Sequence, residues 1–482
     1  MLSSEHELQL AAVPNHRDLL SHLACVVPDK LPEGFWPTRF VIPQSNHRDY
    51  RCEVGGLSGV EWTNRAEPDS IFRFVKRKAE NTNSFNVVLL IPTGVGAEVG
   101  GHAGDATPVA RMLGAICDRV ILHPNVVNAS DLNEMPANAL YVEGSVITRF
   151  MMGTVGLQPV RSNRVLAIID AHKDQRFVDR AVNAISGARG SFGFNCPEVV
   201  CLEPPILLRA RFSPSGRAAG RVEELDGLCK VLDEREGQFD AVAISSVINV
   251  PHEYHLGYYD ARGAMINPWG GVEAMLTHAI SSLYNVPTAH SPMWESQAIA
   301  DLHPGMVEPR MAAESVSMTF LHCILKGLAH SPRIIADPRG INQHGVLNAS
   351  DVSCMVIPDG CLGLPTLAAL EQGIPVIAVK ENRNVMKNDL RKLPWAPGQF
   401  IQVANYWEAA GVMASMRAGI APETARRPLA DTVVTTVRIG QRQEQATVPS
   451  KSNGKQVAAA PEASVPNKSN GKRVPVMAEA TK

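Results

Sequence analysis

Between about residues 84 and 417, short apolar runs alternate with longer amphipathic stretches. Short runs bounded by polar turns predict buried strands, and stretches with apolar positions three to four residues apart predict helices. The predicted strands are Val87–Pro92, Arg119–Leu122, Ala139–Val142, Val165–Ile169, Val199–Leu202, Ala241–Ser245, Thr288–Ala289, Cys354–Ile357, Val376–Val379 and Phe400–Val403. The predicted helices are Pro108–Cys117, Arg176–Ala188, Gly271–Tyr284, Pro309–Leu328, Pro365–Gln372 and Trp407–Ala418.

Strands that alternate with helices indicate a parallel sheet covered by helices on both faces. We therefore predict an α/β fold with mostly parallel sheets in two Rossmann-like halves, residues 84–240 and 241–420. Pro108 and Pro365 suit the first turn of a helix, where the missing N–H costs nothing. Residues 1–83 lack this regular pattern and contain Pro32, Pro37 and Pro43, which predicts an irregular N-terminal segment or cap.

The last part of the chain, from about residue 434, has a different composition. It carries eight basic and three acidic residues, and VPSKSNGK (448–455) recurs as VPNKSNGK (465–472). It contains no aromatic residue and no leucine, so it cannot bury enough apolar surface to offset its ordering entropy. We predict a disordered basic repeat tail over 434–482, which can be removed after Val433 without changing the melting temperature.

Composition and charge argue against several classes of partner and of structure. Lys and Arg number 46 and Asp and Glu 48, a formal charge of -2, so we expect neither a nucleic-acid nor a membrane partner. The apolar runs are far shorter than the roughly 20 residues of a membrane helix. Glu5 and Glu7 stand where a signal peptide would be basic and then apolar, which predicts a cytoplasmic protein. Nine scattered cysteines without a C-x-x-C pair indicate reduced, mostly buried thiols.

A glycine-rich segment, IPTGVGAEVGGHAGDATPV (91–109), follows the first predicted strand and precedes a helix. Glycines let the backbone approach a ligand closely, and a helix N-terminus favours an anion. The segment is neither a Walker A motif nor a clean G-x-G-x-x-G. We predict that it binds an anionic small molecule, and that His102, Asp105 or His123 transfers protons. Asp105 as a helix cap is the alternative.

A second glycine-rich segment, PDGCLGLPTLAALEQGIPVIAVKENRN (358–384), follows a later strand. Glu371 stands near the end of the helix in this segment, and its carboxylate would suit the hydroxyl groups of a ribose. A surface glutamate that contacts no ligand is an equal alternative. Ligands in open α/β sheets lie beyond the carboxyl ends of the strands. The predicted ligand-binding residues are Thr93, Gly94, Gly96, Glu98, Gly100, Gly101, Gly104, Thr107, Asn125, Glu143, Asp359, Gly360, Glu371, Glu381 and Asn382.

No metal site is predicted. Asp170 and His172 stand close together in the sequence without a partner cluster, and residues 252–255 form an H-x-x-H, which lacks the zincin pattern. The sequence identifies no cofactor.

Several motifs resemble a bacterial family, domain of unknown function 3326, over about residues 84–390. They are TGVGAEVGGHAGDATPVARML, HPNVVNA (123–129), NALYVEG (138–144), GGVEAMLTH (270–278) and DGCLGLPTLAALEQGIPVIAVKENR (359–383). The resemblance implies no reaction. The two glycine-rich segments are also similar to the two halves of GT-B nucleotide-sugar enzymes, through Gly100, Gly101, His102 and Pro108 in the first, and in the second through Gly363, Glu371, Gly373, Pro375 and Val376.

Three hypotheses follow. The first is a transferase or epimerase acting on a phosphorylated or nucleotide-linked small molecule. The second is a lyase, isomerase or hydrolase of a small carboxylate, which a metal at Asp170, His172 or His290 would assist. The third is a non-catalytic, ligand-binding regulatory protein. A homo-oligomer is compatible with all three.

Overall fold

One sheet of the fold is fully parallel and has six strands in the order β18-β17-β15-β4-β5-β6. The strands are β4 (Asn86–Leu89), β5 (Arg119–Leu122), β6 (Ala139–Tyr141), β15 (Val352–Pro358), β17 (Val376–Val379) and β18 (Phe400–Val403). All six were predicted, within three residues at their ends. Because β4 pairs with β15, this sheet joins residues 86–141 to residues 352–403, and it does not follow the predicted division at residue 240.

The second sheet has ten strands and is mixed, which corrects the prediction of mostly parallel sheets. Its order is β16-β2-β3-β1-β11-β10-β12-β8-β9, and β13 also pairs with β12. The strands are β1 (Leu2–Ala11), β2 (Trp36–Ser45), β3 (Asp49–Ser58), β8 (Val165–Asp170), β9 (Val199–Leu202), β10 (Leu207–Phe212), β11 (Ala218–Glu223), β12 (Ala241–Asn249), β13 (Thr288–Met293) and β16 (Leu362–Gly363). The predicted strands β8, β9, β12 and β13 pair in parallel, whereas β1–β3 and β10–β11 pair antiparallel.

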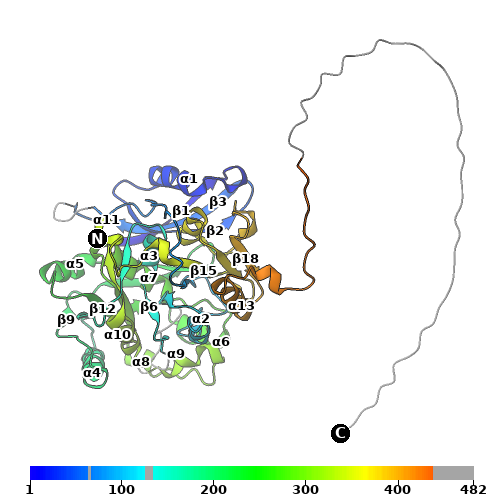
Figure 1. Ribbon diagram of the computed structural model, residues 1–482. Coiled ribbons are helices and arrows are strands. Elements are labelled where there is room, and N and C mark those ends of the chain that lie inside the picture. The colour runs from blue at the N-terminus through cyan, green and yellow to red at the C-terminus, as the bar shows by residue number, and fades with distance from the viewer. Residues whose placement is uncertain (63–66, 125–133, 318, 438–482) are drawn as a thin grey trace, which may run out of the picture. The chain divides into compact units, whose positions relative to one another are not determined.

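The N-terminal segment is therefore not irregular. It forms three ten-residue strands, shown in blue beside α1 (Leu19–Val26) in Figure 1. Strand β2 was not predicted because it contains Pro37 and Pro43, and a proline cannot donate a hydrogen bond to a neighbouring strand. The pairing of β2 with β3 shifts register next to each of them, after Pro37 and between Val41 and Gln44, and such irregularities accommodate proline.

Helices surround both sheets. In addition to α1, the described helices are α2 (Thr107–Gly114), α3 (Gly144–Met151), α4 (Gln175–Phe192), α5 (Leu225–Glu234), α6 (Glu253–Asp260), α7 (Gly270–Tyr284), α8 (Gln297–Ala300), α9 (Ala312–Val316), α10 (Phe320–His330), α11 (Pro338–Ile341), α12 (Leu364–Gln372) and α13 (Tyr406–Arg417). The predicted helix 309–328 is divided into a 3-10 turn (Pro309–Met311), α9 and α10. A short two-stranded sheet joins β7 (Gly156–Gln158) to β14 (Arg333–Ile335).

Strand β8 shows how the core is divided. Its Ala167 and Ile169 belong to a hydrophobic cluster that reaches across to the six-stranded sheet, whereas Leu166 and Ile168 face α5 and α7. Both faces of this strand are buried, which explains its continuous apolar run. Helix α7 packs on the ten-stranded sheet and also against α3.

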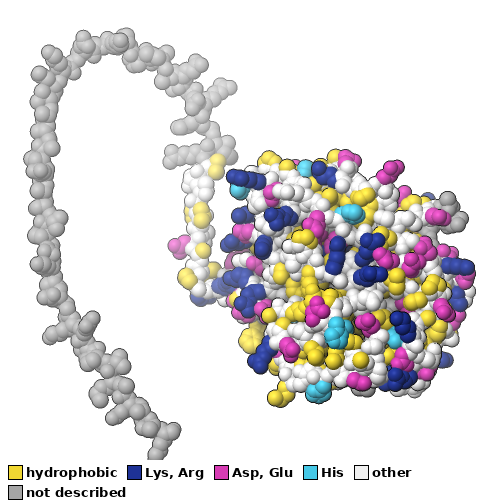
Figure 2. All heavy atoms as spheres, turned by 180° about the vertical axis from the view of Figure 1, so that it is seen from behind, with side chains coloured by type: hydrophobic (Ala, Val, Ile, Leu, Met, Phe, Trp, Pro, Cys, Tyr) yellow, Lys and Arg dark blue, Asp and Glu magenta, His cyan; other side chains and the backbone are white. Residues whose placement is uncertain are grey.

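The computed structural model describes residues 1–62, 67–124, 134–317 and 319–437, and Met1–Arg427 form one compact unit. The predicted tail lies outside the described residues from 438 onward. In the described part of the chain, no helix is long and apolar enough to cross a bilayer. Figure 2 shows basic and acidic side chains interspersed over one face, with apolar side chains exposed between them.

Candidate functional site

A cavity of about 650 Å³ lies where strands of the two sheets end. Residues that follow β4, β5 and β6 line it, namely Thr93, His123 and Glu143, and β13 contributes His290. The carboxyl ends of four strands therefore converge on one space, as expected for an α/β ligand site. Helix α7 forms one wall through Glu273, Ala274, Thr277 and His278.

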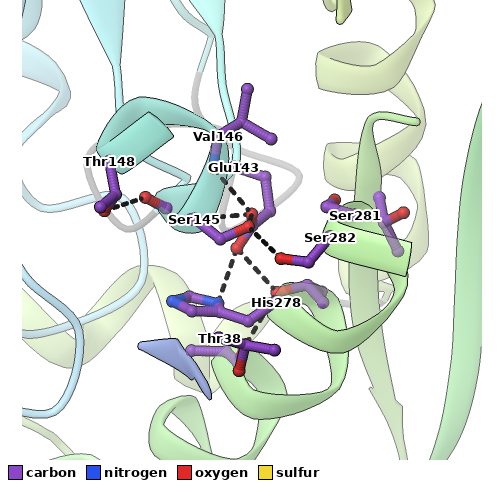
Figure 3. Close-up of polar contacts among 12 residues, drawn as sticks. Thr38, Glu143, Ser145, Val146, Thr148, His278, Ser281 and Ser282 are labelled. Atoms are coloured by element: carbon purple, nitrogen blue, oxygen red, sulfur yellow. Dashed lines mark hydrogen bonds and ion pairs between the residues drawn. The ribbon is translucent and has the colours of Figure 1, made fainter. Parts of the chain in front are cut away.

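Glu143 connects α3 to α7 at this wall (Figure 3). One carboxylate oxygen caps α3 by accepting from the backbone N–H groups of Ser145 (2.9 Å) and Val146 (3.3 Å). The other oxygen lies 2.7 Å from Nδ1 of His278 and accepts from the Thr277 hydroxyl at 3.3 Å. Burial alone would raise the pKa of Glu143, but His278 and Ser145 hold that pKa at about 2, so the carboxylate is ionised.

His123 lies against the same helix N-terminus. A Cβ placed on Gly144 would stand 2.7 Å from Nε2 of His123 and 3.1 Å from Cε1 of His278, so both rings converge above this glycine. Burial lowers the pKa of His123 to about 4, which keeps its imidazole neutral near pH 7. The two imidazoles and the Glu143 carboxylate therefore form one buried polar group at the cavity.

A second histidine–carboxylate pair, His290 with Glu273 of α7, lines the same cavity. Nδ1 of His290 is 3.1 Å from a carboxylate oxygen of Glu273, and Nε2 is 2.7 Å from the hydroxyl of Ser246. The order Ser–His–Glu is that of a nucleophilic triad. Ser246, however, lies inside β12 with 0% of its surface exposed. Its hydroxyl therefore orients His290 and is not open to a substrate.

A third polar group includes Glu314 of α9. Its carboxylate accepts from the Tyr258 hydroxyl (2.6 Å), from the Asn267 amide (2.9 Å) and from the backbone N–H of Ala103 (3.2 Å). The Tyr258 hydroxyl also lies 2.6 Å from Nδ1 of His102. Burial raises the pKa of Glu314 to about 7 and lowers the pKa of His102 to about 4. A carboxyl group with a pKa near neutral pH is suited to general acid–base catalysis.

The first glycine-rich segment holds its own carboxylate where an anion was predicted. Asp105 accepts from the backbone N–H groups of Gly100 (2.8 Å) and His102 (3.4 Å). The alternative prediction, that Asp105 caps the following helix, is wrong: the N-cap of α2 is Ala106, without a side-chain cap hydrogen bond, and Asp105 bonds backbone groups of its own loop. Burial raises the pKa of Asp105 to about 7.

Six of the predicted site residues line the cavity. They are Thr93, Gly94, Gly96, Gly101, His123 and Glu143. His102 lies behind this wall, one hydrogen bond from Tyr258, and Gly100, Gly104 and Thr107 are not among the lining residues. Glu98 instead forms ion pairs with Arg310 and Arg383. Asn125 lies outside the described residues.

The predicted residues of the second segment do not reach the cavity. The buried Asn382 donates to the Val99 carbonyl and accepts from its N–H, both at 2.9 Å, and it also contacts the Tyr406 hydroxyl. Asp359 accepts from the Gln402 amide and from the N–H of Gly360. Glu371 is half-buried on α12, and Glu381 is exposed. Asn382 and Asp359 therefore bond to neighbouring parts of the chain, whereas Glu381 lies at a second pocket together with Glu98 and Arg383.

Sequence analysis did not name Glu273, His278, Tyr258 or Glu314 as site residues. The first two stand five positions apart in GGVEAMLTH, on a helix that was predicted correctly, but this spacing alone does not place them on one face. Tyr258 lies on α6, which was not predicted, and Glu314 lies on α9, which is part of the predicted helix 309–328.

The residues considered for a metal are dispersed. Asp170 is buried at the end of β8, and burial raises its pKa to about 8. His172 contacts Asp174 and Phe177, while His290 pairs with Glu273. Among the described residues, no group of three or more His, Cys, Asp and Glu side chains is arranged to hold a metal ion.

Comparisons with known proteins group the chain but assign no reaction. The chain is 33% identical to an uncharacterized lipoprotein of a Synechococcus species over 343 residues. This aligned region covers 70% of the chain and 92% of the relative. No solved structure is significantly similar. The GT-B likeness therefore gains no support, and the two glycine-rich segments follow neighbouring strands of one sheet, β4 and β15. Residues 86–426 match DUF3326, a family described as protein of unknown function, and the chain belongs to that family.

Proposed function

We propose that this protein is an enzyme that transfers protons to and from a small molecule held in the cavity, an isomerase or lyase. One observation carries the proposal: two histidine–carboxylate pairs, Glu143–His278 and Glu273–His290, line one cavity of about 650 Å³. Such pairs orient an imidazole and stabilise its charged form during proton transfer. Glu314, with a pKa near 7, supplies a third group suited to the task.

The lining favours this chemistry over phosphate chemistry. Phosphates are usually held by Arg or Lys side chains or by free N–H groups at a helix N-terminus. Among the described lining residues, Arg180 is the one Arg or Lys, and its side chain is exposed. Asp105 already occupies the N–H groups of Gly100 and His102 in the glycine-rich loop. Acid–base chemistry on an unphosphorylated substrate therefore fits the site better.

Hydrogen exchange at carbon tests the proposal without knowledge of the substrate. The protein is incubated in D₂O with pools of small metabolites, and deuterium uptake is followed by mass spectrometry. We expect uptake into a small set of related compounds with the wild type and at least a hundredfold slower uptake with Glu273→Gln or His278→Asn. Glu371→Gln, a carboxylate change outside the cavity, serves as the control. Compounds that bind without exchange or conversion would favour a regulatory protein instead.

A further inference from the structure

The cavity has an aromatic wall beside its polar one. Tyr259, Trp269 and Trp294 line it, together with Phe320 and Ile324 at the start of α10. The ring of Tyr258 packs edge-on against Tyr259 (5.2 Å between centroids) and against Trp269 (5.4 Å). This packing fixes the rings that face the cavity. An apolar or aromatic group of a ligand would find a preformed surface here.

Glu273 and Glu314 line the same cavity as these rings. Tyr258, which contacts Tyr259 and Trp269, donates its hydroxyl hydrogen to Glu314. The charges of Asp105 and Glu273 add to burial in raising the pKa of Glu314, so these carboxylates share one negative field. Among the described lining residues, the one Arg or Lys is the exposed Arg180, so the negative field inside the cavity has no internal Lys or Arg to balance it.

One buried polar atom at the cavity wall also lacks a partner. His255 of α6 has 7% of its surface exposed, and its Nε2 makes no hydrogen bond within the described chain. Its ring centroid stands 5.8 Å from that of Trp269, so it belongs to the aromatic wall. A buried ring nitrogen without a partner is unfavourable unless a ligand or water completes it. A ligand with a polar group near the aromatic rings would supply a hydrogen-bond partner for this nitrogen.

Aromatic faces and carboxylates together are the usual recognition chemistry for organic ammonium groups. We infer that the cavity binds an organic amine whose ammonium group lies between Glu273 and Glu314 and whose aromatic or aliphatic body packs against Trp269 and Trp294. The inference deepens the proposed function, since it names the substrate class of the same cavity. A phosphate ester or a carboxylic acid of equal size would meet the carboxylates and be repelled.

Three ligands with one body and different head groups test this inference. 2-Naphthylmethylamine, 2-naphthylmethanol and 2-naphthoate are titrated at pH 8 by calorimetry and by quenching of tryptophan fluorescence. We expect the amine to bind at least tenfold more tightly than the alcohol and the acid to bind most weakly. Glu273→Gln should reduce amine affinity about tenfold and leave alcohol affinity unchanged, and Trp294→Ala should weaken the amine and the alcohol by the same factor.

Glu371→Gln is the matched control, because it removes a carboxylate outside the cavity, and it should change no affinity. Circular dichroism checks the fold of each variant, and Glu314→Gln replaces Glu273→Gln if the latter is unfolded. Equal or tighter binding of 2-naphthoate, no binding of any of the three, or an equal effect of Glu371→Gln would overturn the inference. Deuterium exchange is measured separately. Amine binding without exchange would contradict the proposed function alone, and exchange on an acidic substrate would contradict this inference alone.

Discussion

The two glycine-rich segments look alike in the sequence but have different surroundings in the structure. Both follow neighbouring strands of the six-stranded sheet and lead into a helix. The first turns toward α7 and lines the cavity at Thr93, Gly94, Gly96 and Gly101. The second is covered by the N-terminal strands, because β16 pairs with β2 and the Asn388 amide donates to the Ile42 and Gly360 carbonyls. Glycine marks a close approach to the backbone, and the approaching group is either a ligand or the protein itself.

The largest expected effect separates the two segments at one glycine each. Gly94 (φ +78°) and Gly373 (φ +67°) both have left-handed backbone conformations. A Cβ on Gly94 would stand 2.5 Å from the Ala218 carbonyl oxygen, whereas one on Gly373 meets nothing within 4 Å. We expect Gly94→Ala to lower the free energy of unfolding by about 3–5 kcal/mol and Gly373→Ala by about 1 kcal/mol. Urea denaturation measures both, and equal losses would mean that the first segment relaxes freely.

Asn382 tests whether the second segment supports the first. Its side chain holds both backbone groups of Val99, so Asn382→Ala leaves buried polar groups of the first segment unpaired. We expect a loss of about 2–4 kcal/mol in the free energy of unfolding. Ligand affinity per folded molecule should stay within a factor of three in calorimetry. A selective loss of affinity in a protein of unchanged stability would instead assign Asn382 to the site.

The pH dependence of stability sharpens the comparison at Glu314, which accepts from Ala103 of the first segment. Its pKa is about 7 in the folded protein and 4.5 as a free side chain, so the folded state favours the protonated form. This contribution is complete below pH 4.5 and is lost as the pH rises through 7. Between these values, the free energy of unfolding of the wild type should fall by about 1–3 kcal/mol more than that of Glu314→Gln. Parallel curves for the two proteins, measured by urea denaturation, would contradict this expectation.

The smallest effect is expected in the second segment. Glu371 is half-buried on α12 and does not line the cavity. Glu371→Gln should change the free energy of unfolding by less than about 0.5 kcal/mol and leave ligand affinity and deuterium exchange unaltered. A tenfold loss of affinity would restore the sequence-based hypothesis that this glutamate contacts a ligand hydroxyl.

The hydrophobic pattern predicted the parallel strands well, because most of their apolar runs record burial on both faces, although the edge strands β9 and β18 are only partly buried. β5, β9, β17 and β18 have the predicted boundaries. The antiparallel strands were missed for a physical reason: β10 carries Arg209 and Arg211 on its exposed side, and β2 contains prolines, so neither shows a continuous apolar run. Sheet order could not be predicted, since the pairing of β4 with β15 depends on contacts between distant residues.

The candidate site was predictable where it depends on strand ends and not where it depends on helix faces. Thr93, His123 and Glu143 follow β4, β5 and β6, and the rule for α/β sheets located them. Glu273 and His278 needed knowledge of which side of α7 faces inward. The ligand-binding prediction for Glu381 and Asn382 used the same strand-end rule, but Asn382 is buried against Val99 and Glu381 lies outside the cavity. The rule identifies an edge, and only the packing decides whether it stays open.

The pairing of β4 with β15 also has a consequence for how the chain is made. These central strands of the six-stranded sheet are separated by more than 260 residues, and β1 must likewise find β11 across more than 200. During synthesis, the early strands leave the ribosome long before their partner strands, and their unpaired apolar edges stay exposed until the partners are made. Contacts this far apart in sequence also slow the search for the native arrangement. We therefore expect slow refolding and a dependence on chaperones during synthesis.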